Sequence, residues 1–105
     1  MKNPYPYEKF YMAVRSMASS PKTIHERIAD AYLFNLIHVK TEDLPETIRW
    51  RFDALRDRLT SAEPVANEGK VMATVNEMSM SEAVEIADEI LSLADEVNAD
   101  YLKDR

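Results

Sequence analysis

Carboxylates are the most densely grouped residues in this sequence that could do chemistry. Residues 79–101 read SMSEAVEIADEILSLADEVNADY and contain no lysine or arginine. The acidic side chains of this segment are Glu82, Glu85, Asp88, Glu89, Asp95, Glu96 and Asp100. Carboxylates one helical turn apart could ligate a divalent cation, and a long row of them could imitate the phosphates of DNA. The same residues could instead form the solvated face of a helix, which is the simplest interpretation.

The apolar residues of this segment favour the solvated face. They alternate steps of three and four, which marks an inward seam through Met80, Ala83, Ala87, Ile90, Ala94, Val97 and Tyr101. Most of the carboxylates then fall on the helical positions farthest from that seam. The segment has no histidine that could complete a di-iron motif and no glycine for a calcium loop. We therefore predict that the acidic residues bind no metal ion.

Histidines and nucleophiles provide little further support for catalysis. The two histidines, His25 and His38, form no HExxH motif, and no serine lies in a GxSxG or SxxK motif. His38 shares a predicted helix face with Asn35, so we expect these two residues to form a buried, hydrogen-bonded polar pair. The absence of cysteine excludes thiolate ligands, disulfides and cysteine nucleophiles. We predict no catalytic residue, no cofactor and no metal ligand.

An arginine-rich segment around the single tryptophan is the best candidate for a binding site. Residues 48–59 read IRWRFDALRDRL. Arginines could contact phosphates, and the indole ring could stack on a base. The interleaved acids Asp53 and Asp57 leave little net positive charge, however, and affinity for nucleic acid depends on accumulated charge. Nucleic-acid binding is therefore the alternative function, together with DNA mimicry by residues 79–102.

Helical spacing indicates where the tryptophan lies. Residues Ile48, Phe52, Leu55 and Leu59 form an apolar stripe, and Trp50 projects roughly opposite to it. An exposed aromatic side chain beside arginines is typical of a protein interface. The candidate interaction surface therefore consists of Trp50, Arg49, Arg51 and Arg58. The alternative is that the aromatic N-terminal segment, with Tyr5 and Tyr7, covers the indole ring.

Periodicity and helix-ending residues predict five helices. We expect them at residues 6–18, 21–40, 44–59, 70–78 and 79–102, with a loop at 60–69. For residues 70–78 a short strand is the alternative. Ser79 and Glu82 have the spacing of a capping box at the start of the last helix. The sequence thus predicts an all-α fold, a compact bundle of four to five helices, in which helix two and the C-terminal helix are central.

Length and composition restrict the function further. The 105 residues fit a single helical domain, 1–105, and the one glycine excludes a glycine-rich phosphate loop. Residues 1–75 carry eleven basic and ten acidic side chains, whereas residues 76–105 carry two and nine, so the C-terminal segment supplies the net charge of −6. No apolar run reaches the roughly 20 residues of a membrane span. We expect a cytoplasmic, non-enzymatic interaction or regulatory protein whose partner is another protein or a second copy.

Overall fold

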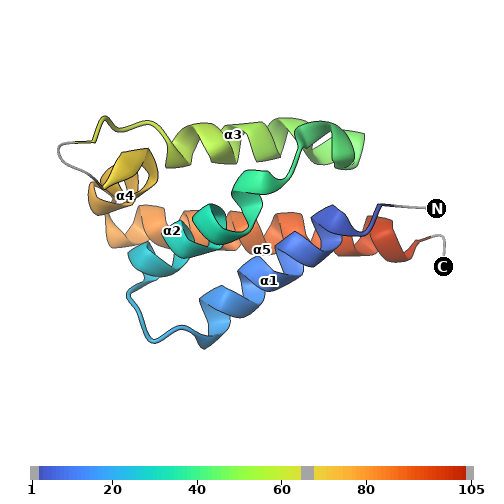
Figure 1. The fold of residues 1–105 in the computed structure, drawn as a ribbon, viewed down its shortest axis with the longest axis horizontal. Helices are drawn as coiled ribbons and strands as arrows, with labels where there is room; N and C mark the ends of the chain where they lie inside the picture. The colour runs from blue at the N-terminus through green and yellow to red at the C-terminus, as the bar shows by residue number, and fades with distance from the viewer. Residues whose placement is uncertain (1–2, 65–67, 104–105) are drawn as a thin grey trace.

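The computed structural model describes residues 3–64 and 68–103, and it confirms the predicted all-α bundle (Figure 1). These residues form helices and no strand. The α-helices are α1 (Tyr5–Ser19), α2 (Ile24–Phe34), α3 (Arg49–Leu59), α4 (Gly69–Asn76) and α5 (Met80–Leu102). Three short 3₁₀ helices connect α2 to α3: η1 (Leu36–His38), η2 (Thr41–Asp43) and η3 (Glu46–Ile48). Within the described ranges, every helix is too short or too polar to cross a membrane.

Helix α5 runs along the molecule and packs against α1, α2 and α3 (Figure 1). Helix α2 packs against α1, α4 and α5, so these two helices together reach every other α-helix. The side of α5 that enters the core carries Ala83, Ile86, Ile90, Leu93 and Val97, all of them buried. Burying such aliphatic side chains contributes about 1.5–3 kcal/mol for each large one, so the packing of α5 contributes substantially to the stability of the fold.

The buried line of α5 differs from the seam predicted from the sequence. Ile86 and Leu93 are fully buried, whereas Met80 is exposed and the two alanines Ala87 and Ala94 are only half-buried. The helix is therefore rotated away from the predicted orientation. The reason is that its apolar arc is wide, so the alternating pattern does not decide which part of the arc faces the core.

Aromatic pairs connect helices that are far apart in the sequence. Phe10 of α1 and Phe52 of α3 meet edge to face, with ring centroids 5.8 Å apart, inside the core. At one end of the bundle, the Tyr7 ring stacks on the Tyr101 ring at a centroid distance of 4.5 Å. This stack places the start of α1 beside the end of α5 (Figure 1). The two helices therefore run in opposite senses, with α1 inclined to α5 in the view of Figure 1.

The second helix is shorter than the sequence predicts. Helix α2 ends at Phe34 instead of continuing to residue 40, because Asn35 leaves the helical region with φ −133°. Asparagine readily gives up helical geometry, since its side chain competes for backbone hydrogen bonds. The tighter η1 turn that follows buries Leu36 and Val39 and leaves Phe34 exposed. The prediction of one continuous helix over 21–40 was thus wrong at both ends, since Thr23 caps α2 at its start.

Residues 69–76 form helix α4, which decides against the alternative of a short strand. The helix begins at Gly69, the only glycine in the sequence, with a φ of +79°. A left-handed φ of this kind strongly favours glycine. Part of the loop predicted before it, residues 65–67, lies outside the described residues. The glycine therefore serves to turn the chain into α4.

The predicted capping box at the start of α5 is confirmed. The Glu82 backbone N–H donates to the Ser79 hydroxyl at 3.1 Å, and the Ser79 backbone N–H donates to the Glu82 carboxylate at 3.2 Å. Two hydrogen bonds lower the pKa of Glu82. The one from the Ser79 backbone N–H has the larger effect, and the one that involves the Ser79 side chain has the smaller effect. The ionised carboxylate is thus the form that the folded helix stabilises.

We predict that the capping box makes stability depend on pH in the acidic range. Because the folded state lowers the pKa of Glu82, its contribution is present above the ordinary glutamate pKa and is lost as the pH falls through the lowered value. The variant Glu82→Gln should be less stable than the wild type at neutral pH, and the difference should shrink as the pH falls. Urea denaturation at a series of pH values measures it. Glu96→Gln, outside the first turn of α5, is the control, and a pH-independent difference for Glu82→Gln would contradict the prediction.

Candidate functional site

Trp50 lies on the outer side of α3, as its helical position predicts. Its side chain is 71% exposed, whereas Phe52, Leu55 and Leu59 on the opposite side of the helix are buried. The N-terminal segment does not cover the indole ring, because Tyr7 stacks on Tyr101 of α5 instead. The alternative in which Tyr5 and Tyr7 shield Trp50 is therefore wrong.

Acidic and small side chains surround the exposed indole. Asp53, Ala54 and Asp57 follow Trp50 by three, four and seven residues, positions that share one side of a helix, and all three are exposed. We call these four residues the Trp50 face. The Asp53 carboxylate accepts a hydrogen bond from the Thr41 hydroxyl at 2.7 Å, and it lies 3.6 Å from a nitrogen of Arg56. The net charge of the Trp50 face itself is negative.

The predicted arginine partners of Trp50 point elsewhere. Arg49 turns back along the chain, where its guanidinium donates to the carbonyl oxygens of Leu44 at 2.9 Å and Glu42 at 3.1 Å. These bonds hold the 3₁₀ segments against the start of α3. Arg49 thus satisfies backbone acceptors in a part of the chain where irregular structure leaves carbonyl groups unpaired.

Arg51 joins α3 to α5. Its guanidinium donates twice to the Glu89 carboxylate, at 3.1 and 2.6 Å, and once to the Ser92 hydroxyl, at 2.8 Å. The two side chains of the ion pair are 23% and 32% exposed, so water screens the pair only in part. The hydrogen bond to Glu89 raises the pKa of Arg51 and keeps the guanidinium charged. This bidentate geometry fixes the side-to-side distance of the two helices.

Arg58 and Arg56 also interact within the chain. Arg58 lies two helical turns beyond Trp50, with a guanidinium nitrogen 3.6 Å from the Glu85 carboxylate of α5. Arg56 donates to the Tyr32 hydroxyl at 3.3 Å and to the Val39 carbonyl at 3.2 Å, with its guanidinium over the Phe52 ring. The fold therefore does not gather Trp50, Arg49, Arg51 and Arg58 into one surface. It leaves Trp50 outside and directs the arginines to acceptors within the chain, although Arg58 itself stays exposed.

The predicted buried polar pair does not form. Asn35 is buried, but His38 is exposed. The pair was predicted from the three-residue spacing of a continuous α-helix, whereas the chain changes to the η1 3₁₀ helix between the two residues. The other histidine, His25, contacts a distant part of the chain. Its Nε2 atom lies 3.0 Å from the carbonyl oxygen of Met78, 53 residues away, and no local sequence pattern indicates this contact.

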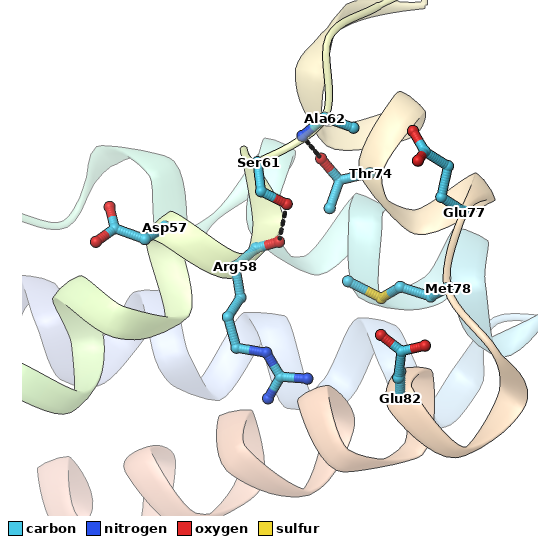
Figure 2. Close-up of a pocket in the computed structure, with 8 residues that line it drawn as sticks. All are labelled: Asp57, Arg58, Ser61, Ala62, Thr74, Glu77, Met78 and Glu82. Carbon is cyan, nitrogen blue, oxygen red and sulfur yellow. Dashed lines mark hydrogen bonds between the residues drawn. The ribbon is translucent and has the colours of Figure 1, made fainter.

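A hollow of about 460 Å³ opens between the end of α3, helix α4 and the start of α5 (Figure 2). Its walls carry the carboxylates of Asp57, Glu77 and Glu82, the guanidinium of Arg58 and the thioether of Met78. Figure 2 shows Arg58 reaching from α3 down toward the first turns of α5. Charged groups of both signs line this hollow, and no motif in the sequence indicated it.

The hydroxyl groups in this hollow already have hydrogen-bond partners. The Ser61 hydroxyl donates to the Arg58 carbonyl oxygen at 3.3 Å, and the Thr74 hydroxyl donates to the Lys70 carbonyl oxygen at 2.7 Å. The Thr74 hydroxyl also accepts from the Ala62 backbone N–H at 3.0 Å (Figure 2). A nucleophilic hydroxyl needs a base within hydrogen-bond reach to take its proton. Each of these two hydroxyl groups instead donates to a backbone oxygen.

The carboxylates of α5 point outward, as predicted for a solvated face. Glu85 and Glu89 lie on the side next to α3 and pair with its arginines, whereas Asp88 and Asp95 are exposed toward the opposite side. Across residues 3–64 and 68–103, no group of three metal-ligating side chains has a suitable arrangement. Pairing with the arginines interrupts the row of acids, which weakens its likeness to a line of phosphates.

Comparison with known proteins adds no assignment, since no family model, curated protein or solved structure matches this chain.

We predict that the Arg51–Glu89 pair stabilises the packing of α3 on α5. Arg51→Ala removes three charge-assisted hydrogen bonds, and after allowance for partial exposure it should lower the free energy of unfolding by about 1–2 kcal/mol. Chemical denaturation measures this change. A double-mutant cycle with Glu89→Ala should give a clear coupling energy, whereas the cycle for Arg58 and Glu85, which are farther apart and more exposed, should give little. Additive effects of Arg51→Ala and Glu89→Ala would refute the prediction.

Proposed function

We propose that this protein is a small, non-enzymatic interaction or regulatory protein of the cytoplasm that binds a protein partner through the Trp50 face. The observation that carries the proposal is the 71% exposure of Trp50 on a well-packed helix. Tryptophan is among the residues that contribute most to protein interfaces, because its large ring removes much apolar area from water at a low cost in side-chain entropy.

The charges near Trp50 indicate the chemistry of the partner. Asp53 and Asp57 lie beside the ring and are exposed, and the neighbouring arginines donate to acceptors within the chain. A partner that presents lysine or arginine next to an apolar pocket would match this arrangement. Its cation could pair with the aspartates or lie over the indole face, and its pocket would receive the ring.

We predict that Trp50→Ala abolishes partner capture without unfolding the protein. The immobilised chain should retain a partner from the lysate of its native organism, and the variant should retain at least about tenfold less, as expected for loss of a central tryptophan. Phe34→Ala is the matched control, because Phe34 is an equally exposed aromatic residue (68%) at the end of α2. Equal capture by the wild type and by Trp50→Ala would refute the proposal.

The single tryptophan also provides a direct measurement of contact. Because the sequence has one tryptophan, the indole fluorescence comes from Trp50 alone. A captured partner that covers the ring should shift its emission to shorter wavelength during a titration. The shift separates direct contact at the Trp50 face from capture by another surface, since binding elsewhere would leave the emission unchanged.

The nucleic-acid alternative has less support. The guanidinium groups of Arg49 and Arg51 donate hydrogen bonds to acceptors within the chain, so they are engaged there instead of facing a phosphate. We predict that mixed-sequence DNA and RNA fragments show no binding at low salt in a fluorescence anisotropy titration. Low salt is the most favourable condition, because phosphate contacts gain strength from counterion release. Binding with a steep salt dependence that is lost in Arg58→Ala would instead favour the nucleic-acid function.

A further inference from the structure

A continuous apolar surface lies between α1 and α5, on the side of α5 away from α3. Two adjacent hollows, of about 160 and 200 Å³, lie along it, and Val14 and Leu91 line both of them. The first hollow extends toward Tyr7 and Asn98, and the second extends toward Ile24 of α2. Val14 and Leu91 therefore mark the middle of a single groove, which we call the α1/α5 groove.

Apolar stripes on both helices border the groove. The stripe on α1 consists of Tyr7, Tyr11, Val14 and Ala18, and the stripe on α5 consists of Met80, Val84, Ala87, Leu91 and Ala94. Tyr11 is 54% exposed and Leu91 is 43% exposed, whereas Val14 and Ala87, one helical turn away on the same stripes, are half-buried. The apolar arc of α5 is thus wide enough for a helix with neighbours on both sides, but α1 covers only part of this side. The uncovered part of this apolar arc forms one patch that adjoins the core, whereas ordinary exposed apolar residues occur singly.

Charges along the outer edges of the groove are divided between the two helices. Asp88 and Asp95 of α5 lie one helical turn before and after Leu91 and are exposed. Arg15 of α1 follows Val14, is exposed, and lies 3.4 Å from the Tyr11 hydroxyl. Near the level of Val14 and Leu91, the edge of α5 therefore carries two acids and the edge of α1 carries one arginine, while the exposed Glu8 lies two turns before Arg15 on α1.

We propose that the α1/α5 groove binds the same groove of a second copy of this chain. In a dimer whose two-fold axis runs along the groove, midway between the directions of the two helices, α1 of each copy lies over α5 of the other near the level of Val14 and Leu91. Arg15 of each copy then lies beside Asp88 and Asp95 of the other, and Leu91 packs on the Tyr11–Val14 stripe. A two-fold interface must be self-complementary, and a surface whose centre has its acids on one helix and its base on the other meets that requirement. The resulting four-helix arrangement buries both apolar stripes.

The size of the groove predicts a weak dimer. Helix α1 has 15 residues and is about 22 Å long, and two helices side by side are about 20 Å wide, giving roughly 450 Å² in projection for each copy. Both copies together bury about 900 Å² or somewhat more, since a rugged surface exceeds its projection. This value is near the lower limit of roughly 1,000 Å² for specific interfaces. The dimer should therefore form in the micromolar to millimolar range.

Sedimentation velocity of the full chain over this concentration range tests the proposal. The wild type should show a reversible monomer–dimer equilibrium, and Leu91→Glu should raise the dimer dissociation constant at least about tenfold, because it places a charge at the centre of the interface. Met12→Glu is the matched control, since Met12 is similarly exposed (51%) on the other flank of α1. Its dissociation constant should equal that of the wild type. A wild type that stays monomeric at millimolar concentration, or a dimer unaffected by Leu91→Glu, would overturn the proposal.

A charge exchange identifies the occupant of the groove. Arg15→Asp and Asp88→Arg should each weaken the dimer, and the double variant should dimerise more tightly than either single variant, because each copy then presents the reversed pair to the other while Asp95 stays acidic. A double variant that dimerises no better than the single variants would overturn the proposed arrangement. Circular dichroism should show an unchanged fold for each variant, since all the substituted side chains are exposed.

The proposal is independent of the Trp50 face, so Trp50→Ala should dimerise like the wild type.

Discussion

The rest of the structure depends on how α5 divides its apolar surface between the core and solvent. Its line through Ile86, Ile90 and Leu93 is fully buried and supports α1, α2 and α3 at once. Because the apolar arc is wider than this line, one flank of α5 remains partly exposed beside α1. On the other flank, α3 packs through its buried side chains and is joined to α5 by the hydrogen bonds between Arg51 and Glu89. The same helix thus contributes to the core, to an ion-paired flank and to one side of the α1/α5 groove.

Electrostatic pairing explains why the sequence looks more like a nucleic-acid binder than the folded protein does. In the sequence, arginines and Trp50 are adjacent, and a long series of acids follows 30 residues later. In the fold, the guanidinium of Arg51 reaches across to Glu89, and that of Arg49 turns to backbone carbonyl oxygens. Charges that would attract phosphates therefore stabilise the packing of helices. The outer side of α3 around Trp50 then carries the indole ring and two aspartates, while Arg58 stays exposed next to α5.

The features that were predictable from the sequence are those set by local spacing. The helical class, the capping box at Ser79 and the outward direction of Trp50 all follow from residues within two turns of each other. The exposure of His38 was not predictable in this way, because it depends on a change of helix type at Asn35 that no glycine or proline marks. The hydrogen-bond acceptors of the arginines could not be predicted from the sequence either. Glu89 is 38 residues from Arg51, and backbone carbonyl oxygens have no signature in the sequence.

The Tyr7–Tyr101 stack has a consequence for how the chain folds. It joins the first and last helices, so it closes a loop that contains nearly all of the described residues. The entropy lost on closing a loop grows with its length, and contacts of this separation slow folding compared with contacts between successive helices. Docking of α1 on α5 is therefore the most non-local step of folding. Because the same docking creates the α1/α5 groove, the groove is built from residues of the two ends of the chain and depends on this non-local contact.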